Sequence, residues 1–351
     1  MAAVHAGRPA FRPVTRFDVG AQRASSAGCL SDATDLSTEL AGVVDEACRD
    51  AGLTGTQRAD SPLLLAMHAE PDLVRTATPE RAVAGAAGSA VALASRTALG
   101  TALRTYTTGC VAASNALVDA ARMIATGAAE RVVVAAGYLV DADYFLAFDA
   151  GRALSVTGLA RPFSTGRDGM VLADAVVAVV LEDPLSAERR GAPELARLAG
   201  WGRAGDAFHV CQPEPDGSGM ARAVTAALRH AGLTPDDLGY LNAHGTGTVQ
   251  SDRAETRALH TALGEHATRI PLSSTKSVHG HTLEASALLE FVITVLTLRS
   301  GRLPVNAGYL GPDDECRALN LVLAGTAGDA RYALSLNSAF GGANTALVVR
   351  A

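Results

Sequence analysis

The chain has 351 residues, of which 48% are hydrophobic and 19% are charged, and its formal net charge is -6. This apolar content is enough for one large core or two fused half-cores, which excludes a disordered or fibrous chain. Recognition of phosphates relies on clustered Lys and Arg, and the sequence has no basic run of that kind. We therefore expect no nucleic-acid partner.

The same pattern predicts a cytoplasmic protein with no membrane partner. The apolar windows 176–181 and 287–298 are interrupted by Asp174 and Glu290 and are shorter than the ~20 residues of a membrane helix. The first twenty residues carry Arg, Pro and Asp where a signal peptide needs an apolar centre. The five cysteines show no CxxC spacing, which fits neither a disulfide framework nor a structural zinc site.

The first half of the chain alternates between helical and strand patterns. In chain order we expect a helix over 36–52 that stops at Gly52, a buried strand over 63–68, close helix packing in 82–103, a helix after Cys110 and a buried strand over 131–137. Cys110 therefore lies where a helix begins. The segments FDAGRALS and RPFSTGRDG then predict surface loops that bracket a hairpin, whose last strand ends near Asp183.

The second half repeats this alternation. We expect helices over 220–231, 252–263 and 282–298, and strands over 239–244, 271–275, 333–338 and 345–350. Two successive blocks of alternating helices and strands are typical of an α/β protein with layered sheets. The block lengths suggest two similar halves, which we place at residues 1–183 and 184–351.

Three segments place reactive side chains at junctions between strands and helices: TTGCVAASNAL, NAHGTGTVQSDRAE and STKSVHGHTLEASALLE. A cysteine at a helix N-terminus experiences the positive end of the helix dipole, so we expect a favoured thiolate at Cys110, as covalent acyl transfer requires. His244 and His281 can donate or accept a proton near neutral pH and stabilise a developing oxyanion or enolate. A single buried cysteine or histidine more often has a structural role.

A metal site is not expected here. His279 and His281 lie two positions apart, a spacing that matches no common helical ligand motif. The sequence places no group of Asp, Glu or Cys ligands beside these two histidines.

In this order, the three segments resemble the β-ketoacyl synthases of the thiolase superfamily, which act in fatty-acid and polyketide pathways. FDAGRALS, ARPFSTGRDGMV, Asp252 and Glu255 after AHGTGT, KS followed by GH, and NSAFGGAN extend the resemblance over nearly the whole chain. The resemblance implies a layered αβαβα fold made of two similar halves. The Cys would lie in the first half and both His in the second.

The resemblance also implies roles for individual residues. Cys110 would accept the acyl group, while His244 and His281 would hold a malonyl-type carboxylate or thioester carbonyl and assist decarboxylation. Lys276 would order the histidines, with Glu290 further along the following helix. The amides of Cys110 and Phe340 would form an oxyanion hole, and Phe340 would also gate substrate entry. Arg167 and Asp168, in the RDG turn, would be structural.

The implied partners follow from the same resemblance. Thr246 and Thr248 would bind the phosphopantetheine arm of an acyl carrier protein, although loop capping by short hydroxyls is the simpler interpretation. No tightly bound cofactor is implied. The chain would form a homodimer, or a heterodimer with another ketosynthase-like subunit.

The sequence departs from the family pattern in several places. The opening strand and first helix are absent, so the first half should lack an edge, and the stretch between His68 and Tyr106 is short. Locally, Ala113 replaces a Gly, LADA over 172–175 replaces Gly-Glu-Gly-Ala, Glu284 replaces a small residue, and AFGGAN replaces GFGGTN. These departures favour a specialised natural-product enzyme over the housekeeping enzyme.

Three hypotheses follow from these patterns. The first is decarboxylative condensation of an acyl group on Cys110 with a malonyl carrier thioester. The second keeps acyl-Cys110 but passes the acyl group to an alcohol, an amine or water. The third is a non-catalytic subunit that pairs with a complete ketosynthase, as chain-length factors do, although such partners typically lack the cysteine.

Overall fold

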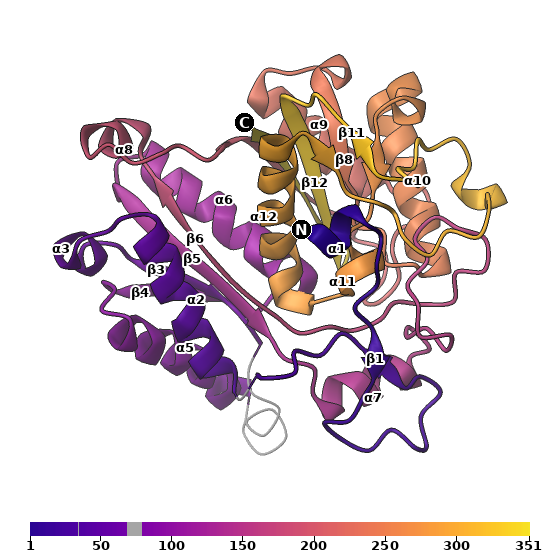
Figure 1. Ribbon diagram of the computed structural model, residues 1–351, viewed down its shortest axis with the longest axis horizontal. Helices are drawn as coiled ribbons and strands as arrows, with labels where there is room; N and C mark the ends of the chain where they lie inside the picture. Colours follow the sequence, from indigo (N-terminus) through magenta and orange to yellow (C-terminus); the bar gives the residue numbers. More distant parts are fainter. Residues whose placement is uncertain (34, 69–78) are drawn as a thin grey trace.

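The computed structural model describes residues 1–33, 35–68 and 79–351 (Figure 1). The expected short stretch between His68 and Tyr106 lies in part outside these residues. The first sheet has the strand order β4 (Ala102–Tyr106), β3 (Leu63–Ala66), β5 (Arg131–Tyr138) and β6 (Ala175–Glu182). Only the pair β5 and β6 is antiparallel. Every residue of β3 and β5 is buried, as expected for apolar strands covered by helices on both faces.

The second sheet repeats this arrangement with one more strand. Its order is β7 (Arg197–Gly205), β13 (Ala343–Arg350), β12 (Tyr332–Ala339), β8 (Leu238–Asn242) and β9 (Leu272–Ser273). Strand β13 is antiparallel to both of its neighbours, as β6 is to β5. The alternating blocks of the sequence thus form two related sheets.

Helices complete five layers. Helices α2 (Leu36–Asp50) and α5 (Pro79–Arg96) cover the outer face of the first sheet, and α9 (Ser218–Ala231) and α10 (Val249–Leu263) cover that of the second. Helices α6 (Ala112–Ala125) and α12 (Ser286–Ser300) contact each other between the sheets, where the largest apolar core lies (Figure 1). The expected αβαβα fold of two similar halves is confirmed. The proposed boundary at 183–184 lies between β6 and α8.

The remaining elements are short. They are α1 (Ala2–His5), α3 (Gly55–Ala59), α7 (Ala142–Ala150), α8 (Pro184–Arg189), α11 (Lys276–His279), strands β1 (Arg12–Pro13), β2 (Ser26–Ala27), β10 (Arg302–Leu303) and β11 (Thr326–Ala327), and the 3₁₀ turns η1 (Gly109–Val111), η2 (Pro235–Asp237), η3 (Gly264–Thr268), η4 (Leu283–Ala285) and η5 (Asp314–Cys316). Within the described ranges, no helix combines the length and apolarity that crossing a bilayer requires.

The first sheet has an open edge at β6. In the second sheet β7 pairs with the outer side of β13, whereas among the described residues no strand pairs with the outer side of β6. The expected missing edge is therefore confirmed. Helix α2, the first long helix of the chain, packs on β6 and β5 as α9 packs on β7 and β13.

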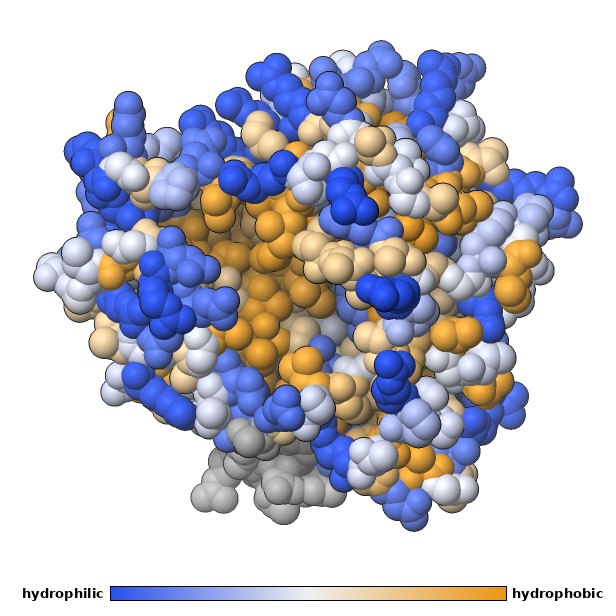
Figure 2. Space-filling view, in the orientation of Figure 1, coloured by the Kyte–Doolittle hydropathy of each residue, from blue (hydrophilic) through white to orange (hydrophobic). Residues whose placement is uncertain are grey.

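Apolar side chains are accessible beside this open edge. Val177, Val179 and Leu181 of β6 are only partly buried against the core that α12 shares. Figure 2 shows a hollow with hydrophobic walls in the region where Figure 1 places β6 and α12. An unpaired apolar edge of this length is unusual, because exposed edges tend to pair with other chains.

The prediction of surface loops in FDAGRALS and RPFSTGRDG is wrong in part, because these segments lie mostly in loops but several of their residues are buried. Helix α7 forms between the strands β5 and β6, and Phe163 and Arg167 are buried in the segment that follows it. Carboxylates make this burial possible by accepting backbone N–H groups: Asp149 bonds Arg23 and Ala24, and Asp168 bonds Val156 and Thr157. The short strand β4 and the glycine-containing β7 were also not expected.

The close approach of β7 to α9 gives a test of this packing. A Cβ atom on Gly202 would lie 1.9 Å from the Ala223 carbonyl oxygen, whereas one on Gly205 in the same strand would meet no atom within 4 Å. We expect Gly202→Ala to lower the free energy of unfolding by about 1–3 kcal/mol or more through forced separation of the two elements. Gly205→Ala is the matched control. Equal unfolding midpoints of the two variants in denaturant would contradict this packing.

Candidate active site

Cys110 lies in the 3₁₀ turn η1 that leads directly into α6. Gly109 has φ +58°, a left-handed conformation that glycine adopts at little cost, and it turns the chain just before the cysteine. Turn η1 contacts η4, α12 and the β12–β13 hairpin of the second half. The expected position of Cys110 at a helix start is confirmed, and it faces elements of both halves.

The expected thiolate at Cys110 is not supported by its surroundings. The residue is partly exposed, but its side chain packs into an apolar cluster of the first half. Burial and then the Glu284 carboxylate raise the pKa of Cys110 to about 12, and the opposing effects of Lys276 and the residue's own backbone N–H are smaller. These surroundings favour the protonated thiol over the thiolate.

His281 is held in one tautomer by its neighbours. The backbone N–H of Leu283 donates to Nδ1 of His281 at 3.0 Å, and the Ser286 hydroxyl lies 3.1 Å from the same nitrogen. Because a backbone N–H can only donate, Nδ1 must accept, and the proton of the neutral imidazole is on Nε2. The Nε2–H group of His281 can therefore donate a hydrogen bond.

His244 lies beside His281. The centroids of the two rings are 5.7 Å apart and the rings are nearly perpendicular. The turn that carries His244 is fixed by Glu255, whose two oxygens accept the backbone N–H groups of His244 and Gly245, both at 2.7 Å. Asp252 similarly accepts from Gly247 and Phe163. Sequence reasoning noted Asp252 and Glu255 as matches but did not assign them this positioning role.

Lys276 and Glu290 form a buried ion pair next to the histidines. Lys276 is 1% exposed and Glu290 is fully buried. Glu290 also accepts a 2.7 Å hydrogen bond from the Asn337 side chain. Burial raises the pKa of Glu290, whereas Lys276 and Asn337 oppose this shift. The pair places a positive charge among the imidazoles.

This charge and the burial keep the histidines neutral. The pKa of His244 is lowered well below its usual value by burial, by Lys276 and by His281. The pKa of His281 is lowered well below its usual value by burial, Lys276 and His279. A neutral imidazole can donate a hydrogen bond through its N–H and carries no extra proton to release.

The other residues singled out from the sequence are placed as follows. The hydroxyls of Thr246 and Thr248 lie 2.9 Å from each other, and Phe340 is 57% exposed with its ring 5.7 Å from that of Phe148. Arg167 is buried and pairs with Asp313 at 2.5 Å. Asp168 binds the backbone of the preceding loop. A structural role fits the geometry of these last two residues.

The structure also shows the surroundings of residues that depart from the family pattern. Asp174 of LADA accepts hydrogen bonds from the backbone of Val140 and Leu30 and pairs with Arg16 at 2.7 Å, which joins the N-terminal segment to the end of β5. Ala113 is fully buried in α6. His279 binds Thr275 and Gly280, and among residues 1–33, 35–68 and 79–351 no cluster of potential metal ligands occurs.

Glu284 faces inward rather than outward on its turn. It is 5% exposed and its Oε2 lies 2.5 Å from Nδ1 of His68, at the end of β3. The His68 ring stacks on Tyr144, with ring centroids 4.1 Å apart, and meets the edge of Tyr138. Sequence reasoning noted Glu284 but missed these three partners, because nothing in the sequence indicates that they converge.

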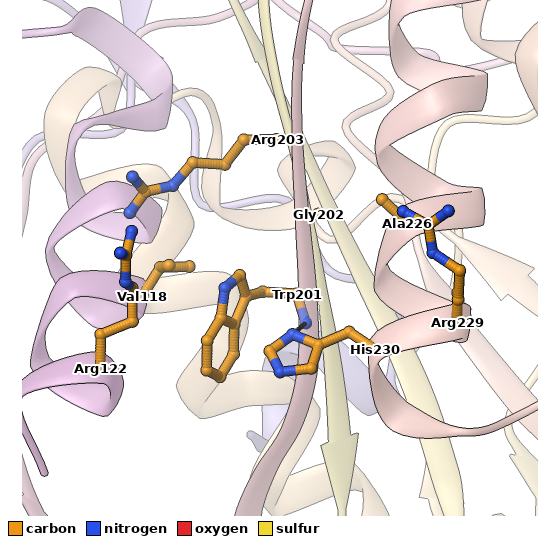
Figure 3. A pocket seen from close by; sticks show the side chains of 8 residues that line it. All are labelled: Val118, Arg122, Trp201, Gly202, Arg203, Ala226, Arg229 and His230. Atoms are coloured by element: carbon orange, nitrogen blue, oxygen red, sulfur yellow. Dashed lines mark hydrogen bonds between the residues drawn. The ribbon is translucent and has the colours of Figure 1, made fainter. Parts of the chain in front are cut away.

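A surface groove is separate from this site. Figure 3 shows it between α6 and α9, on both sides of β7, with Trp201 and His230 in contact at its centre. It is lined by Val118, Arg122, Trp201, Gly202, Arg203, Ala226, Arg229 and His230. None of the candidate catalytic residues contributes to it.

Comparison with known families matches both halves of the chain. The model of the β-ketoacyl synthase N-terminal domain matches residues 32–187, and that of the β-ketoacyl synthase C-terminal domain matches residues 195–309. The 3-oxoacyl-[acyl-carrier-protein] synthase 2 of Staphylococcus aureus is 35% identical over 248 residues, which cover 69% of this chain and 62% of that protein. The same synthase of Synechocystis is 36% identical over 69% of this chain and 60% of its own length. The chain thus spans less than two thirds of these relatives.

Solved structures are similar over almost the whole chain. A β-ketoacyl synthase from Burkholderia phymatum is 28% identical with a TM-score of 0.90, covering 99% of this chain and 94% of that one. A ketosynthase solved with its type II polyketide acyl-carrier protein and bound to a hexaketide is 26% identical with a TM-score of 0.87, covering 100% of this chain and 94% of that one. The ishigamide ketosynthase/chain length factor is 25% identical with a TM-score of 0.86, covering 99% and 93%.

The ion pair at the centre of the site gives a stability test. Glu290→Gln leaves the Lys276 ammonium buried without its counter-charge, so we expect a loss of about 3–5 kcal/mol in the free energy of unfolding. Adding Lys276→Met should restore most of this loss, because the unpaired charge is removed. The exposed pair of Arg269 and Glu265 supplies the control, since Glu265→Gln should change stability by about 0–1 kcal/mol. A double variant less stable than Glu290→Gln would contradict the ion pair.

The lowered histidine pKa values predict an acid-dependent loss of stability. Below about pH 6.5 the unfolded chain binds protons on these histidines, whereas the folded chain does not. Proton binding therefore stabilises the unfolded chain as the pH falls, and it has no such effect at higher pH. Unfolding at about pH 5.5 should cost about 1.4 kcal/mol less per neutral buried histidine than at pH 7.5. His281→Asn should reduce this pH dependence, measured by urea unfolding at both values. The exposed His209→Asn is the control, and equal slopes in both variants would refute the assignment.

Proposed function

Because the chain belongs to the β-ketoacyl synthase family, we propose that it joins an acyl group held on Cys110 to a malonyl carrier thioester by decarboxylative Claisen condensation. The reaction would serve polyketide or fatty-acid-type biosynthesis. The observation that carries this proposal is the convergence of Cys110, His244 and His281 from both halves around the buried pair of Lys276 and Glu290.

The first step is exchange of thioesters. Sγ of Cys110 attacks the acyl carbonyl of the carrier thioester, the carbon–sulfur bond to the carrier breaks, and the thiol proton passes to the departing carrier sulfur. The raised pKa of Cys110 fits this proton-neutral exchange, because no free thiolate is needed before attack. We assign the oxyanion that forms to the amides of Cys110, in η1, and Phe340, in the loop between β12 and β13, because η1 contacts both of these strands.

The second step forms the carbon–carbon bond. The malonyl carboxylate leaves as CO₂, and the electron pair moves onto the thioester, whose oxygen becomes an enolate. Nε2–H of His281 would donate to that oxygen, with His244 beside it. The enolate carbon attacks the acyl thioester and the carbon–sulfur bond to Cys110 breaks. The departing sulfur takes up one proton from solvent, which is the proton that the overall condensation consumes. Lys276 keeps the imidazoles neutral and, with Glu290, fixes their surroundings.

The partners belong to the same proposal. An acyl carrier protein would present each thioester on its phosphopantetheine arm, with Thr246 and Thr248 as its ligands and Phe340 as the gate. A second ketosynthase-like subunit, identical or different, would pair with the chain. The similarity to a ketosynthase solved with its acyl-carrier protein and to a ketosynthase/chain length factor supports these two partners.

One observation favours the alternative of acyl transfer to an alcohol, an amine or water. Glu284 is a buried carboxylate near Cys110, paired with His68, and such a pair could accept a proton from an attacking nucleophile. The third hypothesis, a non-catalytic subunit, has less support, because Cys110 is retained together with both histidines.

Acyl loading provides the decisive measurement. We expect intact-protein mass spectrometry to show an acyl mass on the wild-type chain after incubation with acyl carrier thioesters, and none on Cys110→Ala. With malonyl carrier present, the acyl mass should disappear and a product two carbons longer should form with release of CO₂. Release of free acid or an ester without malonyl would instead support the alternative. Absence of any acyl mass across a carrier panel would refute both.

A further inference from the structure

We propose that the acyl site selects acyl groups that carry a hydroxyl group, which Glu284 and Tyr138 bind beside Cys110. This inference rests on the proposed function and names the class of acyl substrate. Glu284, His68 and Tyr138 are contributed by η4, by the end of β3 and by the end of β5. Glu284 thus comes from the second half of the chain, and His68 and Tyr138 from the first.

The position of this cluster relates it to the acyl group. Turn η4, with Glu284, contacts both η1, with Cys110, and β5. Cys110 and Tyr138 belong to one apolar cluster, together with Leu283 and Phe148. An acyl chain attached to the cysteine sulfur would therefore lie in a mostly apolar region. The side chains of Glu284, His68 and Tyr138 are the polar groups of this region that we consider.

The buried hydroxyl of Tyr138 is available to bind a ligand. Tyr138 is 1% exposed, and its hydroxyl has no hydrogen-bond partner among the residues that the structure describes. Buried polar groups are rarely left unpaired, and an exception calls for an explanation. The ring of Tyr138 meets the ring of His68, with centroids 5.2 Å apart. Burial raises the pKa of Tyr138, and the carboxylates of Asp141 and then Glu284 add to this effect, so both carboxylates lie near its hydroxyl.

The backbone beneath Glu284 is also unusual. Leu283 has φ +42°, in the left-handed region that a branched side chain seldom occupies. This conformation lets the Leu283 N–H bind His281 while the next residue directs its carboxylate inward. Strain of this kind persists where the surrounding structure enforces it, often at functional sites. One turn thus positions both the catalytic imidazole and Glu284.

The chemistry of the cluster selects one substituent. A carboxylate oxygen accepts hydrogen bonds and cannot donate them, whereas the Tyr138 hydroxyl can donate. A hydroxyl on the acyl chain can donate to Glu284 and accept from Tyr138 at the same time. A keto oxygen can only accept and would be repelled by the carboxylate. A plain alkyl chain would offer neither group a hydrogen bond and would leave the Tyr138 hydroxyl without a ligand partner.

Matched thioesters test this selectivity. Three acyl chains of equal length, unsubstituted, hydroxylated and oxidised to the ketone, are compared as pantetheine thioesters, with the substituent on the third or the fifth carbon. Loading on Cys110 is followed by mass spectrometry without malonyl carrier. We expect one hydroxyacyl thioester to load about tenfold faster than both its alkyl and its keto counterparts. Equal or faster loading of the alkyl chains would overturn the proposal.

Variants locate the source of the preference. Tyr138→Phe removes only the unpartnered hydroxyl, and Glu284→Met replaces the carboxylate with an apolar side chain of similar length. Each should bring the ratio of hydroxyacyl to alkyl loading rates down to about one. Tyr106→Phe is the matched control, because Tyr106 is also buried but its hydroxyl donates to Asp119 at 2.8 Å. A preference that survives in both variants would refute the assignment.

A binding measurement separates this proposal from the proposed function. Cys110→Ala cannot be acylated, so a shift of its unfolding temperature by the hydroxyacyl thioester, greater than that by the alkyl thioester, would report recognition alone. If no acyl group loads on the wild-type chain but this shift is present, the proposed function fails and the inference stands. If loading occurs and the shift and the preference are both absent, the inference fails and the proposed function stands.

Discussion

The site depends on the packing of α6 against α12 between the two sheets. Cys110 precedes α6 and Glu290 lies within α12, while the turn with His281 leads into α12. Because these helices form the middle layer, any shift between them would change the distance between Cys110 and the histidines. The same layer holds the largest apolar core, so the burial that stabilises the fold also fixes the catalytic geometry.

Burial has opposite chemical consequences for the groups of this site. It keeps the imidazoles neutral, which suits hydrogen-bond donation to a thioester oxygen, and Lys276 strengthens this effect. It also disfavours the Cys110 thiolate, and the Glu284 carboxylate adds to that effect. The chain therefore holds the Cys110 thiol next to a carboxylate that disfavours its ionisation.

The two halves differ at the edges of their sheets. Strand β7 completes the second sheet, and its glycines let α9 approach closely, whereas the outer side of β6 stays unpaired within the described residues. The apolar side chains of β6 then border a hollow next to α12, the helix that carries Glu290. Helix α12 therefore borders the hollow at the open edge and also carries a residue of the candidate site.

The sequence by itself determined the α/β class and most helices and buried strands, because periodicity is a local property of the chain. Ordered motifs, which are also local, indicated the candidate site residues Cys110, His244, His281, Lys276 and Glu290. The sequence could not determine that parts of 148–169, such as Phe163 and Arg167, would be buried, because that depends on carboxylates such as Asp149 that accept N–H groups from distant segments. It also suggested a thiolate at Cys110 from the helix start alone. Only the tertiary structure decided the pKa of that thiol and the convergence of Glu284, His68 and Tyr138, since desolvation and contacts between distant residues arise only when the chain is packed.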